Sequence, residues 1–264
     1  MRWDPAGGEI DVAALDGHDA AVNLAGAGIG DHRWTKEYKA LVRDSRVEGT
    51  ILVARTLAAL DHPPRVLASG SAVGYYGDRG DAELTEEDGP GTGFLAGVVQ
   101  EWEAATAPAS EAGIRVAHLR SGIVQTPEGG ALGRLLLPFK AGLGGRIGTG
   151  RQWLSWISLD DEIGAIRHVL DHRSLHGPVN LTAPTPVTNA EYSRALGRVI
   201  HRPTLIPTPT VALWALLGRE LVGEMLLAGQ RVLPGKLTAS GYAFRHPLLE
   251  PALGEMLGRP PATS

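Results

Sequence analysis

The chain of 264 residues contains no cysteine. Without thiols it can form no disulfide framework, no thiolate nucleophile and no cysteine-ligated zinc site. Such a composition is typical of proteins in a reducing compartment, so we expect a cytoplasmic protein. The nine histidines include no HExxH motif, and we predict no metal site.

Long apolar runs and a large excess of one charge are also missing. No stretch approaches the ~20 apolar residues that cross a bilayer, and the opening sequence MRWDPAGGEID lacks the apolar core of a signal peptide. The net charge of -4 and the pI of about 6.1 give no general attraction to nucleic acid or to anionic membranes. We therefore expect a soluble chain with neither as a partner, and a homodimer stays open.

Short apolar runs alternate with helix-like segments through most of the chain. This alternation predicts an α/β protein with a doubly wound parallel sheet. Residues 1–18 are polar and turn-rich and predict a loop, not a strand. Asp160 or Asp161 is expected to cap the helix that begins there. Strands are predicted near 20–24, 66–68, 114–119, 156 and 178–181, and helices near 45–60, 94–112, 131–141, 160–170 and 189–200.

The stretch RVLASGSAVGYYG, residues 65–77, is the most informative segment. Its apolar start predicts a strand that is buried on both faces. Ser69 and Ser71 then place two hydroxyls at the carboxyl end of that strand, where open α/β sheets bind their ligands. The alternative is a plain strand end with turn-forming serines.

Two further segments define the organisation of the chain. The sequence AGAGIG at 25–30 lacks the GxGxxG spacing, so we reject it as a dinucleotide-binding turn. From Pro203 the composition of the sequence changes, with a proline-rich turn that is followed by a helical, apolar stretch at 211–227. We therefore divide the chain into a first domain at 1–202 and a small C-terminal, substrate-side domain at 203–258.

Several motifs together resemble a known family. The segments AVNLAGAGI (21–29), SRVEGT (45–50), SGSAVGYYGD (69–78) and WLSWISLDDEIGAI (153–166) resemble the extended short-chain dehydrogenase/reductase superfamily, in its NAD-dependent epimerase/dehydratase branch. The tail at 226–253 is similar to the C-terminal domain of unknown function (DUF1731-like) of an uncharacterised epimerase subgroup. The resemblance implies a Rossmann-like fold, NADP(H) or NAD(H) as cofactor, and an unknown small-molecule substrate.

The chain departs from the family pattern in two places. The segment at 2–11 resembles the stretch after the family's second strand, so the glycine-rich β-α-β unit that binds the diphosphate is not found, and we expect a start assigned too late. Cofactor binding is doubtful without that unit. The Tyr-x-x-x-Lys pair is also missing: the positions that match it are Phe94 and Val98, and phenylalanine cannot transfer a proton.

The resemblance also assigns roles to particular residues. Ser71 matches the active-site serine, and Tyr75 is a candidate for the missing acid, so these two form the predicted catalytic set. The predicted cofactor-binding residues are Asn23, Leu24, Ala25, Gly26, Ser69, Arg120 and Gly122. Trp34, Trp153 and Trp156 are candidate walls of a substrate pocket, although core packing is the commoner use of tryptophan.

Two functions remain open at this point. The first is an NADP(H)-binding oxidoreductase or epimerase-like protein, inactive in this form if the missing parts are essential. The second is a non-catalytic member of the same fold that senses a dinucleotide or binds a protein. The retained serine strand favours the first, and the loss of the Tyr-Lys pair favours the second.

Overall fold

A computed structural model describes residues 3–5 and 7–259 of the chain. Its centre is a four-stranded sheet of order β10-β6-β4-β3 in which every neighbouring pair is parallel. The strands are β3 (Ala20–Asn23), β4 (Val66–Ala72), β6 (Arg115–Ser121) and β10 (Gly177–Leu181). This is the Rossmann-like α/β sheet that the alternation of segments predicts.

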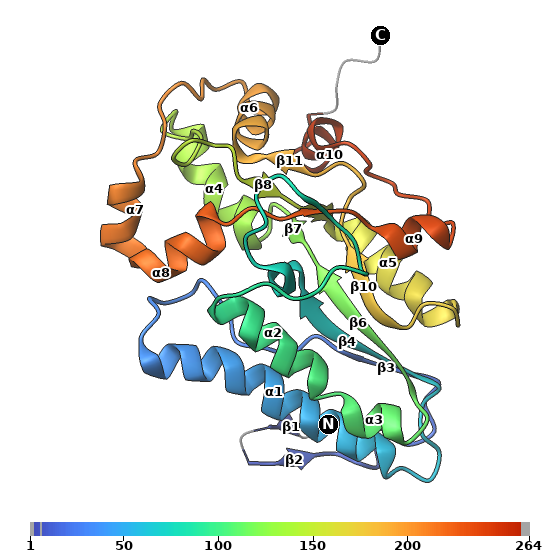
Figure 1. The fold of residues 1–264 in the computed structure, drawn as a ribbon. Coiled ribbons are helices and arrows are strands. Elements are labelled where there is room, and N and C mark those ends of the chain that lie inside the picture. Colours follow the sequence, from blue (N-terminus) through green and yellow to red (C-terminus); the bar gives the residue numbers. More distant parts are fainter. Residues whose placement is uncertain (1–2, 6, 260–264) are drawn as a thin grey trace.

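Helices cover both faces of the sheet (Figure 1). On one face lie α1 (Lys36–Ala58), α2 (Phe94–Ala104) and α3 (Ala107–Glu111). There Leu57 and Ala109 pack with Leu67 and Val116 of the strands. On the other face, α5 (Leu159–Asp171) packs Ala165 and Val169 against the sheet. The central strands β4 and β6 are therefore buried for most of their length, whereas β3 at the edge of the sheet exposes Val22.

A second group of elements lies beyond the carboxyl ends of the strands. Helix α4 (Gly130–Lys140) and helix α6 (Asn189–Val199) share a core with α10 (Leu249–Met256), built around Leu132, Trp156, Leu196 and Leu253. Along the chain, α6 is followed by α7 (Thr210–Leu217), α8 (Arg219–Val222), the π-helical turn Gly223–Leu227 and α9 (Gly235–Ala239), which precede α10. No helix in the described part of the chain is long and apolar enough to span a bilayer.

Five short strands and one two-stranded hairpin were not predicted. The hairpin joins β1 (Trp3–Asp4) to β2 (Glu9–Ile10), so the prediction of a loop without strands at 1–18 is wrong; residues 1, 2 and 6 lie outside the described part. The other short pairs are β5 (Glu83–Leu84) with β12 (Arg231–Val232), β7 (Ile123–Gln125) with β9 (Trp156–Ser158), and β8 (Trp153–Leu154) with β11 (Val187–Thr188). Of the last six strands, only β9 was expected.

Two helix starts also differ from the prediction. Helix α1 begins at Lys36, nine positions before the predicted start at 45, because the Thr35 hydroxyl accepts a hydrogen bond from the Tyr38 amide and caps the helix there. Helix α5 is capped by Ser158, whose hydroxyl accepts from the Asp161 amide at 3.0 Å. Asp160 and Asp161 therefore lie in the first turn of α5 and are not its cap.

Candidate active site

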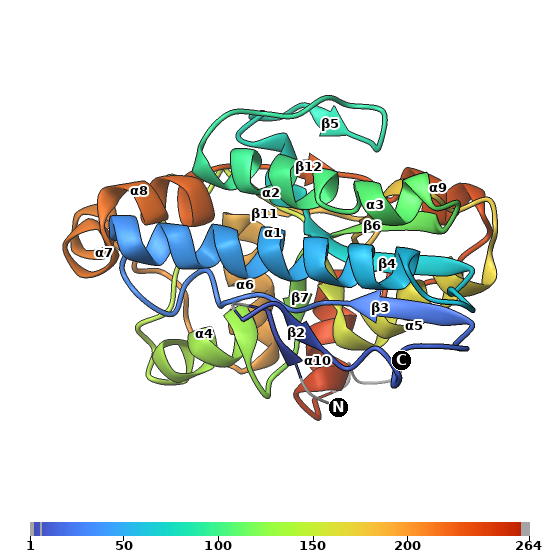
Figure 2. The ribbon, with the colours of Figure 1, turned by 90° about the horizontal axis from the view of Figure 1, so that it is seen from below.

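Parallel strand register gathers the predicted residues at one edge of the sheet. Asn23 at the end of β3 is level with Ser69 on β4, and Ser71 on β4 is level with Arg120 on β6. The carboxyl ends of the three strands thus meet, and this is the edge at which open α/β sheets bind ligands. Figure 2, turned from the first view, shows the same layering of α1, α2 and α3 along β3 and β4.

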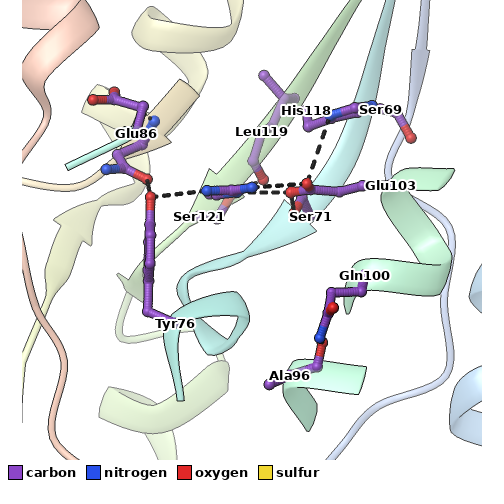
Figure 3. Close-up of polar contacts among 12 residues, drawn as sticks. Ser69, Ser71, Tyr76, Glu86, Ala96, Gln100, Glu103, His118, Leu119 and Ser121 are labelled. Carbon is purple, nitrogen blue, oxygen red and sulfur yellow. Dashed lines mark hydrogen bonds and ion pairs between the residues drawn. The ribbon is translucent and has the colours of Figure 1, made fainter. Parts of the chain in front are cut away.

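The chemistry at this edge is organised by Glu103 of α2, a residue that the sequence interpretation did not single out. Its carboxylate accepts a hydrogen bond from the Ser71 hydroxyl at 2.6 Å. It also accepts two from Arg120, Nε to Oε1 at 2.7 Å and Nη2 to Oε2 at 2.8 Å. The side chains of Arg120 and Glu103 are only 3% and 11% exposed, so this bidentate ion pair is buried (Figure 3).

The ionisation of this pair follows from its contacts. Burial by itself raises the pKa of Glu103, but the hydrogen bonds from Arg120 and Ser71 outweigh burial and hold that pKa below its ordinary value. Burial lowers the pKa of Arg120, yet the carboxylate of Glu103 outweighs it and the net pKa is raised. Both groups are therefore charged at neutral pH. His118, whose Nδ1 lies 3.8 Å from Glu103, has a pKa lowered chiefly by burial and is neutral.

The two adjacent tyrosines have different environments. Tyr76 is fully buried; its hydroxyl donates to Asn180 Oδ1 at 2.8 Å and accepts from Arg120 Nη1 at 3.0 Å. Burial raises the pKa of Tyr76. Tyr75 is partly exposed, and the guanidinium of Arg120 lies 3.4 Å from its ring centroid. Arg120 thus connects both predicted catalytic residues, Ser71 through Glu103 and Tyr75 through its ring.

The predicted cofactor-binding residues fall into an open group and a buried group. Leu24, Ala25 and Gly26 follow β3 and are exposed. Asn23 is buried, with its amide donating to Thr50 Oγ1 at 3.0 Å and its side-chain oxygen accepting from the Ala25 amide. The open group alone can touch a ligand directly.

On the neighbouring strands the predicted cofactor residues are less accessible. Ser69 is 0% exposed, and its hydroxyl reaches only the Gly70 carbonyl, at 3.5 Å. The guanidinium of Arg120 is 3% exposed and donates two hydrogen bonds to Glu103 and one to Tyr76. Both side chains are thus buried in this structure, and their contact with a cofactor stays a prediction. Gly122 is needed for packing, because a Cβ there would lie 2.5 Å from the Ser155 carbonyl oxygen.

The three predicted pocket tryptophans do not come together. Trp156 is 0% exposed and belongs to the core, so it cannot form an open pocket wall. Trp34 donates to the Ile29 carbonyl at 3.0 Å and packs edge-on against Phe94. Trp153 donates to Asp81 at 2.8 Å, beside a hollow of about 530 Å³ that Asp81, Gln152 and Trp214 help to line.

The first turn of α2 is held by the C-terminal part of the chain. The carboxylate of Glu224 accepts from the amides of Phe94 at 2.8 Å and Leu95 at 2.7 Å. Gly93 precedes the helix at φ +108°, a backbone conformation that favours glycine. Phe94, which the resemblance matches to the family's tyrosine, is therefore fixed between Trp34 and the Glu224 contact.

One histidine pair at helical spacing was overlooked in the sequence. His168 lies in the last turn of α5 and His172 directly follows the helix, and their rings stack with centroids 3.6 Å apart. His168 Nε2 is 2.9 Å from the Ser240 hydroxyl. Within the described residues no group of three or more histidine, aspartate or glutamate side chains is arranged to hold a metal ion.

Comparisons with known proteins agree with this geometry. Residues 10–181 match the model of the NAD dependent epimerase/dehydratase family, and residues 208–256 match a domain of unknown function, DUF1731. An epimerase family protein of Mycobacterium bovis is 45% identical over 260 residues, covering 98% of this chain and 85% of that protein.

Two solved structures support the same assignment. The crystal structure of human epimerase family protein SDR39U1 (isoform 2) with NADPH superposes with a TM-score of 0.88 at 37% identity, over 92% of this chain and 83% of that one. A nucleoside-diphosphate sugar epimerase from Corynebacterium glutamicum gives a TM-score of 0.77 at 36% identity, over 97% of this chain and 49% of that one. The chain belongs to the NAD-dependent epimerase/dehydratase family, with a C-terminal DUF1731 domain.

Proposed function

We propose that this protein binds NADP(H) across the carboxyl ends of β3, β4 and β6 and acts as an oxidoreductase or epimerase-like enzyme on a small molecule. The observation that carries this proposal is the register that sets the Asn23 loop, Ser71 and Arg120 side by side. The human relative crystallised with NADPH supports the same choice of cofactor.

The residues at this edge fit part of the cofactor. The exposed Leu24 and the small residues Ala25 and Gly26 offer an open surface of the kind that an adenosine moiety packs against. Among the described residues, β3, the glycine-rich segment 25–30 and α1 follow one another in the order strand, glycines, helix, but the segment lacks the GxGxxG spacing and α1 begins only at Lys36. We therefore assign the adenosine side to this surface and assign no diphosphate site to it.

Each site residue has its own proposed role toward the substrate. Bound NADP(H) would supply or accept the hydride. The Ser71 hydroxyl donates to Glu103, so its lone pairs are left to accept a hydrogen bond from a substrate hydroxyl. Tyr75, which is partly exposed beside Arg120, is the proposed proton donor in place of the missing tyrosine. Glu103 and Arg120 position these two groups and do not exchange protons themselves.

A second function is favoured by one specific observation. Ser71 is 5% exposed with its proton committed to Glu103. The resemblance also matches Phe94 and Val98 to the positions of the Tyr-Lys pair. A protein with this arrangement can bind a dinucleotide without turning over a substrate. It would then act as a sensor or as an interaction module.

Titration with NADPH separates these outcomes. We expect quenching of tryptophan fluorescence and a rise in Tm, and we expect Leu24→Asp to weaken NADPH binding tenfold or more because it puts a carboxylate beside an anionic ligand. Leu248→Asp, at an equally exposed leucine of the C-terminal part, is the matched control. Absence of binding by the folded protein refutes the proposal.

Turnover then distinguishes enzyme from sensor. Reduction of simple carbonyl compounds is followed as NADPH consumption at 340 nm, and epimerisation of sugar nucleotides, which consumes no net NADPH, is followed by chromatography of the products. An enzyme loses turnover in Ser71→Ala and Tyr75→Phe while NADPH binding persists. Binding without turnover of any of these compounds supports the sensor instead.

A further inference from the structure

Helix α7 has an unusual composition for its position on the surface. Its sequence TVALWALL, Thr210–Leu217, carries no charged residue, yet none of its side chains is buried. Val211 and Leu216 are 67% and 68% exposed. A helix that is apolar all round is ordinarily buried in a protein core or in lipid. In this structure neither covers it.

Neighbouring segments extend this exposed apolar surface. Leu205 and Ile206, just before α7, are 88% and 63% exposed, and Leu137 and Leu143, in and after α4, are 77% and 68% exposed. Backbone contacts hold these segments together: the Thr208 amide donates to the Arg146 carbonyl at 2.8 Å. Figures 1 and 2 both place α4 and α7 at the same end of the molecule. We call these segments, residues 137–146 and 194–217, the α4–α7 face.

Basic side chains lie in the same segments as the apolar residues of the α4–α7 face. A pocket of about 440 Å³ is lined by Arg194, Arg198, His201 and Arg202. Arg198 is paired with Glu250 at 2.5 Å, and Arg194 lies near Glu191. Arg202 and two more exposed cations, Lys140 and Arg146, make no ion pair with a carboxylate in the described part of the chain; Arg202 donates to the Lys140 carbonyl at 2.9 Å. The face therefore carries an uncompensated positive charge.

The charge and shape of the α4–α7 face favour one of three possible partners, namely a second copy of the chain, a helical peptide or a lipid bilayer. A second copy of the chain would bring this basic rim against itself in a two-fold contact, which like charges disfavour. A helical peptide needs an apolar groove, whereas Leu205 at 88% exposure protrudes. Protruding apolar side chains with arginine and lysine beside them match the interface of a bilayer with anionic headgroups.

We propose that the α4–α7 face docks this protein peripherally on an anionic lipid surface. The apolar side chains of α7 and of residues 205–206 enter the headgroup region, and the arginine pocket receives a lipid phosphate. The overall charge of -4 led to the expectation of no membrane partner. That expectation averages over the whole surface, whereas docking depends on the local charge of one face, since screening limits its range to about 10 Å.

Vesicle flotation tests this proposal directly. The full chain is mixed with vesicles of phosphatidylcholine alone or of phosphatidylcholine and phosphatidylserine in equal parts. We expect binding to the anionic vesicles, reduced about fivefold for each arginine removed in Arg194→Ala and Arg202→Ala. Leu205→Ser combined with Ile206→Ser should abolish it. Arg167→Ala and Ile163→Ser, exposed residues of α5, are the matched controls and should bind normally.

A local readout distinguishes docking from nonspecific adsorption. Trp214 lies on α7, so its fluorescence should shift to the blue with anionic vesicles, and Trp214→Phe should remove that shift while flotation persists. Three results would overturn the proposal: no flotation of the folded protein, equal flotation of the Leu205/Ile206 double variant, or a dimer in light scattering that this double variant dissociates. The last result would identify the face as an interface between copies.

Discussion

Glu103 and Arg120 form a bidentate pair in a site where water cannot replace either partner. We expect Glu103→Leu to leave Arg120 buried without a counter-charge and to lower the free energy of unfolding by roughly 3–5 kcal/mol. Urea denaturation followed by circular dichroism measures this loss.

The same helix supplies the control for that experiment. Glu101 pairs with Arg43 at 2.7 Å, but both side chains are about half exposed. Glu101→Leu should therefore cost no more than about 1 kcal/mol. Adding Arg120→Met to Glu103→Leu should restore much of the loss, because a buried charge is then no longer unpaired. Equal effects of Glu101→Leu and Glu103→Leu would contradict this account of the pair.

Glu162 gives the protein a pH dependence of a particular sign. It lies in the first turn of α5, where one carboxyl oxygen contacts the Ser121 hydroxyl at 2.5 Å and the other has no hydrogen-bond partner among the described residues. Burial raises its pKa from 4.5 to about 7. At this site the folded state binds more protons than the unfolded state between pH 4.5 and 7, so the contribution of Glu162 to the free energy of unfolding falls as pH rises through that window, by up to about 3 kcal/mol.

The Glu162→Gln variant tests this sign. A neutral amide removes the titration, so the variant should lose the decline in stability between pH 4.5 and 7 and should be more stable than the parent at pH 8. Asp160→Asn, at an exposed carboxylate of the same turn, should keep the parent slope. Stability curves from urea titrations at several pH values give the comparison. Equal slopes for the parent and for Glu162→Gln in this window would refute the raised pKa.

The sequence interpretation identified Ser71 and Arg120 but missed Glu103, which binds both of them. Ser71 and Arg120 stand at strand ends, where a pattern of short apolar runs followed by polar residues identifies them. Glu103 stands in a helix, next to the buried Trp102, where one charge in an apolar helix face was the only signal. The hydrogen bonds of Glu103 to Ser71 and Arg120 depend on how α2 packs on β4, and no local sequence pattern specifies that packing.

At the element scale, the long segments could be predicted and the short ones could not. The β4, β6 and α6 segments have enough apolar residues in phase to be recognised. The two-residue strands β5, β8, β11 and β12 exist because distant segments pair with them, so their own sequences carry almost no information. The early start of α1 was missed because Lys36–Asp44 is mostly polar and the Thr35 cap was not recognised.

Helix α2 offers a prediction about the link between the two parts of the chain. Glu224 supplies the acceptor that Gly93, lacking a side chain, cannot supply at the start of α2. Glu224→Ala should cost about 1–2 kcal/mol and should speed hydrogen exchange at the amides of Phe94 and Leu95. Glu220→Ala, which removes an exposed pair with Lys39, should leave these amides protected. Unchanged exchange in Glu224→Ala would show that the contact does not hold the helix.

At the scale of the whole molecule, the division at residue 202 remains a prediction, and the contacts argue for strong coupling across it. Val232, Leu237 and Leu253 come from the C-terminal part and are 0% exposed, each in a core cluster shared with the first part. The Asp161 carboxylate accepts from the amides of Arg245 at 2.8 Å and His246 at 2.9 Å. Neither part can keep its core closed alone.

Cooperative unfolding follows from this shared core. Leu253→Ala should cost about 2–5 kcal/mol, and the loss should appear equally in tryptophan fluorescence and circular dichroism, as a single shifted transition. A chain ending at residue 202 should bind a hydrophobic dye and show no cooperative transition. Two separate transitions, with only one moved by Leu253→Ala, would mean that the parts fold independently. In that case the Glu224 contact would be a docking contact between two domains, and it would form after both had folded.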